Sequence, residues 1–220
     1  QAIALGFVPE DLQSAYQQDI TRGEFAAIAM QFLAAQYGYD VENFYFALTW
    51  RAAQDPDAPQ LESPFVDGVS RHVDWAYSLG VVNGRRMTEN EAGLKRGTFD
   101  PDAPITRQEA AVVLARVYRL YAEEPQTKTP LTYQDAKDVA DWAKDDVALM
   151  TQLGVMNGVA KGKFNPKGQY TVEQCLVTLV RLYEKTAQGK TPVGTYPLQL
   201  GQRETVIGQT WEGSKLYRYE

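Results

Sequence analysis

A chain of 220 residues with 44% apolar side chains is long enough to bury a sizeable core, either as one domain or as a few small repeats. Its net charge of −6 argues against a general surface for nucleic acid or anionic membranes, although it is compatible with a local basic groove. No apolar run approaches the roughly 18 residues that a spanning helix needs, so we expect no membrane insertion.

The first residues have the pattern of a helix end. Ile3–Pro9 is an apolar stretch interrupted by Gly6, the residue type that most often follows a helix. Because the chain begins within this pattern, we expect a preceding portion that the sequence does not include. The pattern predicts a partial first unit.

A threonine followed three residues later by Glu or Gln occurs three times, and each occurrence precedes an apolar run at helical spacing. The three capping frames are Thr21–Glu24, Thr106–Glu109 and Thr171–Gln174. This spacing is typical of a capping box, so Thr21, Glu24, Thr106, Glu109, Thr171 and Gln174 are predicted capping residues. The first two frames also contain an arginine, Arg22 and Arg107, where the third has Val172. Capping requires no arginine, so this difference separates scaffold from candidate site.

Residues 38–64 form an insertion between the first two units. Asp40 is a candidate cap for a helix from Val41 to about Ala53, and the proline-rich stretch 55–59 ends it. This helix is rich in aromatic residues, which favours a cover for the core over a platform for a ligand.

The same order of parts precedes the second and third frames. Before the second frame the order is Phe65-x-Asp67, a helix, Leu79–Gly84 and Phe99–Pro101. Before the third frame it is Tyr133–Asp135, a helix, Leu153–Gly158 and Phe164–Pro166. The lengths differ where loops tolerate it, since 84–99 is longer than 158–164. The long loop contains Arg85, Arg86, Lys95 and Arg96, which either add local positive charge or, as the default expectation, belong to a solvated loop.

These units predict an all-α fold of three helix–loop–helix repeats. Two short helices cannot bury their apolar faces alone, so the units must pack on one another. The expected division is 1–37 for a partial first repeat, 38–64 for the insertion, 65–124 and 125–186 for the second and third repeats, and 187–220 for a tail. Glycines interrupt short β-prone runs in this tail, which predicts two or three strands that pack on the repeats or begin a further domain.

The second unit contains four motifs in succession: Phe65-x-Asp67, Leu79–Gly84, Phe99-x-Pro101 and Thr106–Glu109. With these motifs it strongly resembles the S-layer homology (SLH) domain. The resemblance covers about residues 1–185 and is degenerate in the third unit. It implies a noncatalytic pseudo-threefold bundle located outside a bacterium, to which the tail is expected to add a small C-terminal β segment. It also implies that grooves between repeats bind secondary cell-wall polysaccharide, which often contains pyruvylated sugars. No cofactor or metal is implied.

The chemistry agrees with this resemblance, because a guanidinium matches a pyruvate carboxylate bidentately and a helix N-terminus also favours an anion. The candidate ligand-binding residues are Arg22, Arg107, Asp67, Gly80 and Gly84. The alternative for both arginines is a structural ion pair with an acidic residue of the adjacent unit. Without an arginine, the third groove is expected to be structural.

Four other residues have expected roles. Trp75 is predicted to lie in the core, and Cys175 to be a buried structural thiol. His72 has no partners for a metal site and is expected to be a solvated or hydrogen-bonded surface residue. Trp142 is better placed for exposure, but its neighbouring site is expected to be the one without an arginine.

Two other functions stay open at this stage. Degenerate repeats without sugar binding would form a protein–protein or self-assembly module, with the 38–64 insertion as its partner surface, and self-association is possible. A glycoside hydrolase would need two catalytic carboxylates, but the acidic residues that can be placed are caps or loop aspartates.

Overall fold

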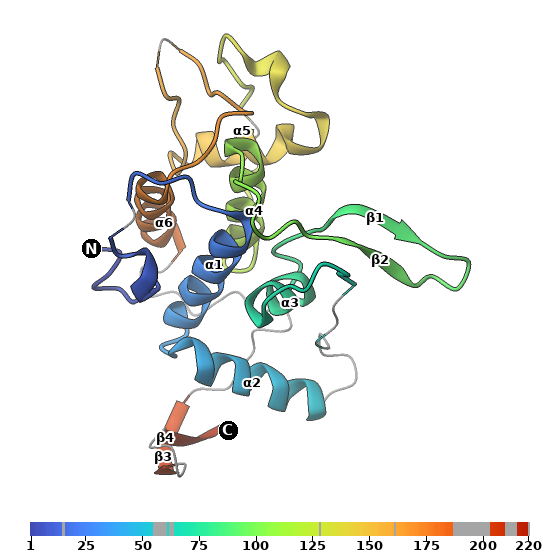
Figure 1. Cartoon of the computed structure of the whole chain (residues 1–220). Coiled ribbons are helices and arrows are strands. Elements are labelled where there is room, and N and C mark those ends of the chain that lie inside the picture. The colour runs from blue at the N-terminus through green and yellow to red at the C-terminus, as the bar shows by residue number, and fades with distance from the viewer. Residues whose placement is uncertain are drawn as a thin grey trace.

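The computed structural model describes residues 1–14, 16–54, 61, 64–127, 129–160 and 162–186, and the backbone of two strands near the C-terminus. Helices predominate, and the strands form two separate two-stranded antiparallel sheets (Figure 1). The elements are η1 (Glu10–Leu12), α1 (Arg22–Gln36), α2 (Val41–Gln54), α3 (Arg71–Ser78), β1 (Arg85–Glu89), β2 (Lys95–Thr98), α4 (Arg107–Arg119), η2 (Ala136–Asp138), η3 (Asp141–Ala143), α5 (Lys144–Gln152), α6 (Val172–Thr186), β3 (Arg203–Gln209) and β4 (Lys215–Tyr219).

Helices α1, α4 and α6 each begin directly after the threonine of a capping frame. In the first two frames the threonine hydroxyl accepts the N–H of the third helical residue, and the glutamate accepts the N–H of the threonine. In the third frame the Gln174 N–H donates to Thr171 Oγ1 at 3.3 Å, while the Gln174 side chain accepts a bond from Arg107. The sequence pattern thus marks the start of all three helices.

The predicted helix ends at glycines share one turn. Each glycine has a positive φ, which a residue with a Cβ adopts only with strain; these are Gly6 (76°), Gly80 (70°) and Gly154 (71°). The N–H after each glycine donates to the carbonyl five residues before it, which closes a Schellman-type C-cap, as in Phe7 to Ala2, Val81 to Ala76 and Val155 to Met150. The first unit contains this turn without a preceding helix.

Three backbone hydrogen bonds join the segments before the capping frames into a closed ring. The Ile20 N–H donates to Tyr170 O (2.8 Å), the Tyr170 N–H to Ile105 O (3.2 Å), and the Ile105 N–H to Ile20 O (3.0 Å). All three side chains are buried in the core. Because each unit donates once and accepts once, we infer that the units are arranged about a pseudo-threefold axis.

The aromatic helix α2 covers the core with one face. Asp40 Oδ1 accepts the Asn43 N–H at 2.9 Å, as expected of the predicted cap. Phe44 and Tyr45 are fully buried, whereas Phe46 and Trp50 on the other face are exposed. Helix α1 packs against α2, α3 and α4. No helix within the described ranges is long and apolar enough to cross a membrane.

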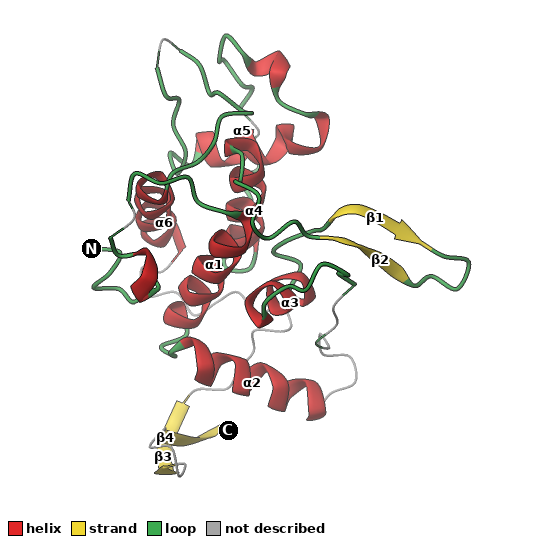
Figure 2. Cartoon of the chain, viewed as in Figure 1, coloured by secondary structure: helices red, strands yellow, loops and turns green. Residues whose placement is uncertain are grey.

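The segment between Gly84 and Phe99 is largely exposed, as expected of a solvated loop, but it is not irregular. This segment forms the β1–β2 hairpin, which projects away from the helices (Figure 2). Its base pairs with residues before α3, because the Gly97 N–H donates to Pro64 O and the Val66 N–H donates to Gly97 O. This pairing partner is distant in sequence, and the charge pattern of the loop does not indicate it.

The tail contains two strands, β3 and β4, which pair with each other. They coincide with two of the β-prone runs in the sequence. The prediction of what the tail packs on or continues into lies outside the described residues.

Candidate functional site

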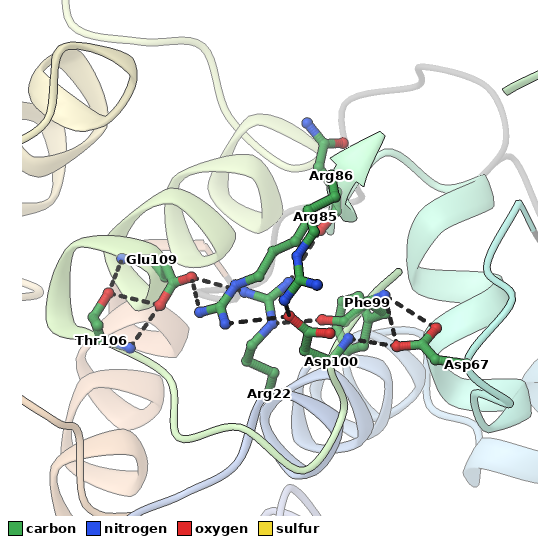
Figure 3. A network of polar contacts seen from close by, with 9 residues as sticks. Arg22, Asp67, Arg85, Arg86, Phe99, Asp100, Thr106 and Glu109 are labelled. Atoms are coloured by element: carbon green, nitrogen blue, oxygen red, sulfur yellow. Dashed lines mark hydrogen bonds and ion pairs between the residues drawn. The ribbon is translucent and has the colours of Figure 1, made fainter. Parts of the chain in front are cut away.

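The contact between the first capping frame and the second unit, here junction one, is built around Arg22. Its Nε–H donates to Phe99 O at 2.8 Å, Nη2 donates to Asn83 O at 3.2 Å, and Nη1 lies 3.0 Å from Glu109 Oε1 (Figure 3). The guanidinium also lies over the Phe99 ring, 4.5 Å from its centroid. Three of the five N–H donors are therefore used by the neighbouring unit.

Arg107 repeats this arrangement at junction two, the contact between the second frame and the third unit. Its Nε–H donates to Phe164 O at 2.8 Å and Nη2 donates to Asn157 O at 2.8 Å. Its third partner is the neutral amide of Gln174, at 3.2 Å from Nη1. The structural ion pair expected as the alternative is therefore present for Arg22. The described contacts of Arg107 are hydrogen bonds and cation–π contacts with the rings of Phe164 and Tyr170.

Junction three, where the third frame meets the first unit, has no arginine. Val172 is buried, and its N–H donates to Gln18 O at 3.0 Å. The equivalent N–H groups of Arg22 and Arg107 donate to Ala103 O and Gly168 O. The backbone connection between units is thus kept at all three junctions, with or without the guanidinium.

Glu109 is the charged centre of junction one. Its Oε1 accepts from Arg22 and, at 2.7 Å, from Arg85, while its Oε2 accepts from both the N–H and the hydroxyl of Thr106. Burial alone would raise the pKa of this carboxyl, but the bonds from Arg85 and Thr106 and the charge of Arg22 outweigh it and lower the pKa. Glu109 is therefore held in the ionised form.

A pocket of about 430 Å³ opens at junction one. It is lined by Arg22, Phe25, Val82, Asn83, Gly84, Arg85, Arg86, Phe99, Ile105, Glu109, Val112, Val113, Arg116 and Trp142. Among these described lining residues are four arginines and a single carboxylate, so the pocket is electropositive although the chain is acidic overall. An anionic ligand is the kind that such a pocket favours.

Two of these arginines reach the solvent from the start of the hairpin. The side chain of Arg86 is 79% exposed and that of Arg85 is 35% exposed, while Arg22 is only 8% exposed. Both hairpin arginines lie 3.6 Å from Asp100 Oδ2 (Figure 3). They are better placed than Arg22 to meet an incoming carboxylate, because most of the Arg22 donors are already used.

Of the candidate ligand-binding residues, Arg22 and Gly84 line this pocket, whereas Arg107, Asp67 and Gly80 do not. Both Asp67 carboxylate oxygens accept the Phe99 N–H, and Oδ2 also accepts the Asp100 N–H at 2.7 Å. Burial would raise the pKa of Asp67, but these bonds outweigh it and lower the pKa. The geometry favours a role for Asp67 in holding the loop that carries Phe99.

Trp142 was expected to be exposed beside the junction without an arginine, and the second part of this prediction is wrong. This side chain is 60% exposed, as its position indicated, but it lines the pocket that contains Arg22. It belongs to the third unit and reaches the junction of the first two. The alternative for the basic loop, that it adds local positive charge, agrees with the place of Arg85 and Arg86 in the pocket lining. The Arg-Arg pair directly after Gly84 is the sequence signal for them.

The remaining expectations concern residues away from the pocket. Trp75 and Cys175 are buried, as predicted, and burial raises the pKa of the thiol. His72 Nδ1 lies 2.5 Å from the Tyr45 hydroxyl, which agrees with the expected hydrogen-bonded role.

Comparison with known proteins identifies a family model and several similar proteins. Residues 92–111 and 132–171 match the family model of the S-layer homology domain. The chain is 30% identical over 125 residues to the exoglucanase XynX of Acetivibrio thermocellus (54% of this chain, 10% of the relative). It is 25% identical over 177 residues to cell surface glycoprotein 1 (77% and 7%), and 29% identical over 103 residues to the cellulosome-anchoring protein (47% and 22%), both from the same species. The chain thus spans less than a quarter of each of these relatives.

Proposed function

This chain belongs to the S-layer homology family, and on that premise we propose that it is a noncatalytic module that anchors a larger protein to the cell wall. The family and its cell-surface relatives indicate a location at the cell surface or in the wall. The enzyme names among the relatives belong to proteins of which the chain matches only a small part. The anchoring role is supported by the relative that is named for it.

We further propose that the ligand is an anionic, pyruvylated secondary cell-wall polysaccharide. The observation that carries this proposal is the electropositive pocket at junction one, with Arg85 and Arg86 at its mouth. A guanidinium binds a carboxylate through parallel charge-assisted hydrogen bonds. The half-exposed indole of Trp142 adds a flat apolar face beside these charges, on which a sugar ring can pack.

Arg22 serves this site as a positioning residue. Arg22 donates hydrogen bonds to Phe99 O and Asn83 O and forms an ion pair with Glu109. Glu109 in turn accepts a hydrogen bond from Arg85 and so positions it. The proposed ligand contacts are therefore Arg85, Arg86 and Trp142. Arg107 is assigned to the connection between the second and third units, because its side chain is buried and has the same set of structural bonds.

The test is retention of the protein on native and depyruvylated cell walls. We expect retention on native walls, a loss of about tenfold in affinity for Arg86→Gln, and no effect of this substitution on depyruvylated walls; tenfold corresponds to about 1.4 kcal/mol. Arg71→Gln is the matched control, since it removes one exposed arginine that is 48% exposed and lies outside the pocket lining. Equal retention on both walls would contradict the proposed role of the carboxylate.

A second candidate is a self-assembly module without sugar binding. The favouring observation is the outer face of α2, where Phe46 is 53% and Trp50 is 45% exposed, one helical turn apart. Concentration-dependent sedimentation that is abolished by Phe46→Ser, together with no retention on walls, would select this function over polysaccharide binding.

A further inference from the structure

The β1–β2 hairpin presents a basic face that is continuous with the pocket at junction one. The hairpin holds four basic and two acidic side chains, in a chain whose net charge is −6. It replaces a short connection at the equivalent place of the third unit, so it is an addition to one junction only. Its position relative to the pocket follows from strand register.

In an antiparallel pair, residues directly opposite each other point to the same face, and so do residues two apart in one strand. Arg85 pairs with Thr98, and Thr88 pairs with Arg96. Between these two pairs β1 contains one residue more than β2, so the strand pairing is irregular there and the extra residue lies in β1. Thr98 and Arg96 are two apart in β2, so Arg85, opposite Thr98, and Arg96 share one face of the hairpin. Because Arg85 lines the pocket, Arg96 extends the same positive face outward, by about 7 Å along the strand.

The opposite face differs in composition. Glu89 lies opposite Lys95 on that face, so the positive charge of Lys95 has an acidic residue across from it on the neighbouring strand. Nearer the base, Met87 packs against the core. A Cβ at Gly84 or at Gly97 would lie 2.5 Å from the Met87 sulfur, so both glycines leave room for this side chain. The two faces therefore separate into a basic one and an anchoring one.

The base of the hairpin is fixed to the body of the molecule. Gly97 exchanges backbone hydrogen bonds with residues 64–66, and Phe65 packs on Phe99 with ring centroids 5.4 Å apart. The strands project from this fixed base away from the helices (Figure 2). Arg96 is not among the residues that line the pocket, so only a ligand that extends beyond the pocket along the hairpin would meet it.

We propose that Arg96, on the face of the hairpin that continues outward from Arg85, forms a second subsite that binds a further anionic residue of the same wall polysaccharide. This proposal rests on the proposed function and makes the module selective for chains that contain more than one charged sugar. Charge complementarity favours a polyanion, and continuity with the pocket favours the polymer bound there. Binding at two linked subsites raises affinity without any change at the first.

The experiment uses the whole chain and measures affinity for the purified wall polysaccharide and for its shortest fragment with one pyruvyl group. Arg96→Gln is compared with Lys95→Gln, a neighbour with the same charge change on the opposite face. We expect Arg96→Gln to weaken binding of the polymer about fivefold and to leave binding of the fragment unchanged, and Lys95→Gln to change neither by more than about twofold. Both side chains are exposed, so both variants should fold.

Other outcomes separate the proposals. Equal losses for the two variants, on the polymer or on dextran sulfate as a generic polyanion, would show general charge attraction and overturn the second subsite. The subsite is equally overturned if the native chain binds the polymer and Arg96→Gln has no effect, while the proposed function stands. If the native chain binds neither polymer nor fragment, both proposals fall.

Discussion

At junctions one and two, equivalent arginines donate to equivalent pairs of backbone carbonyls, but the residues around the two arginines differ. At junction one the arginine meets a carboxylate, Glu109, to which Arg85 also binds, and a basic hairpin lies beside it. At junction two the partner is the amide of Gln174, and the adjoining connection is short. The shared part holds units together, and the part that differs creates the electropositive pocket. Under the proposed function, the motif arginine positions the site and the hairpin arginines contact the ligand.

Removal of Arg22 is expected to have the largest effect on stability. Arg22→Ala leaves two carbonyls without their donor and Glu109 with one cation fewer, in a buried setting. Breaking a buried ion pair in this way costs about 3–5 kcal/mol. Urea unfolding should show this loss. Arg71→Ala removes an exposed ion pair and a cation–π contact with Tyr45, and should cost no more than about 1 kcal/mol. A loss no larger than that of the control would show that the Arg22 contacts do not stabilise the fold.

Arg107→Ala tests junction two in the same way. It also removes donors from two carbonyls, but it leaves no carboxylate behind, since its third partner is an amide. We expect a loss of about 2–3 kcal/mol in the free energy of unfolding, smaller than for Arg22→Ala. An equal or larger loss would mean that the charge of Glu109 adds nothing to junction one.

Glu109→Gln gives the arginine of junction one an amide partner, as Arg107 has at junction two. The pKa of Glu109 is lowered below its ordinary value of 4.5, so the ionised form stabilises the folded state above that pH, and this contribution is lost as the pH falls further. The variant should be less stable than the native chain by about 1–2 kcal/mol at pH 7, and the difference should shrink as the pH falls below 4.5. A difference that stays constant or grows on acidification would contradict the ionised pairing.

Gln174→Glu makes the reverse change and should have the smallest effect. A carboxylate at this position can pair with Arg107 and return a bond to the Thr171 N–H, which completes the third capping box. We expect a gain of about 1 kcal/mol at pH 7, because desolvation of the new charge offsets part of the pairing energy. Thermal unfolding at pH 7 and pH 3 checks both the gain and its disappearance in acid.

The local features of this fold could be predicted from sequence, because they depend on residues close together in the chain. The capping frames, the glycine-terminated turns and the burial of Trp75 follow from spacing and residue type. The orientation of Arg22 could not be predicted, since two of its partners are backbone carbonyls that any residue at those positions would supply.

The content of the pocket depends on contacts between units. Trp142 reaches the junction of two other units because of the ring in which the three frames are linked, and no spacing in the sequence states this order. Likewise, Arg85 enters the pocket because residues 84–99 pair as a hairpin whose base is held by residues 64–66. The site therefore required the fold, while the family resemblance did not.

The most direct test of this account compares equivalent loops at the two junctions. Arg86→Gln removes a cation from the loop of junction one, and Lys163→Gln removes one from the corresponding loop of junction two; both side chains are exposed. Affinity for purified wall polysaccharide should fall about tenfold for Arg86→Gln and change by less than about twofold for Lys163→Gln. Equal losses, or a larger loss for Lys163→Gln, would contradict the assignment of binding to junction one.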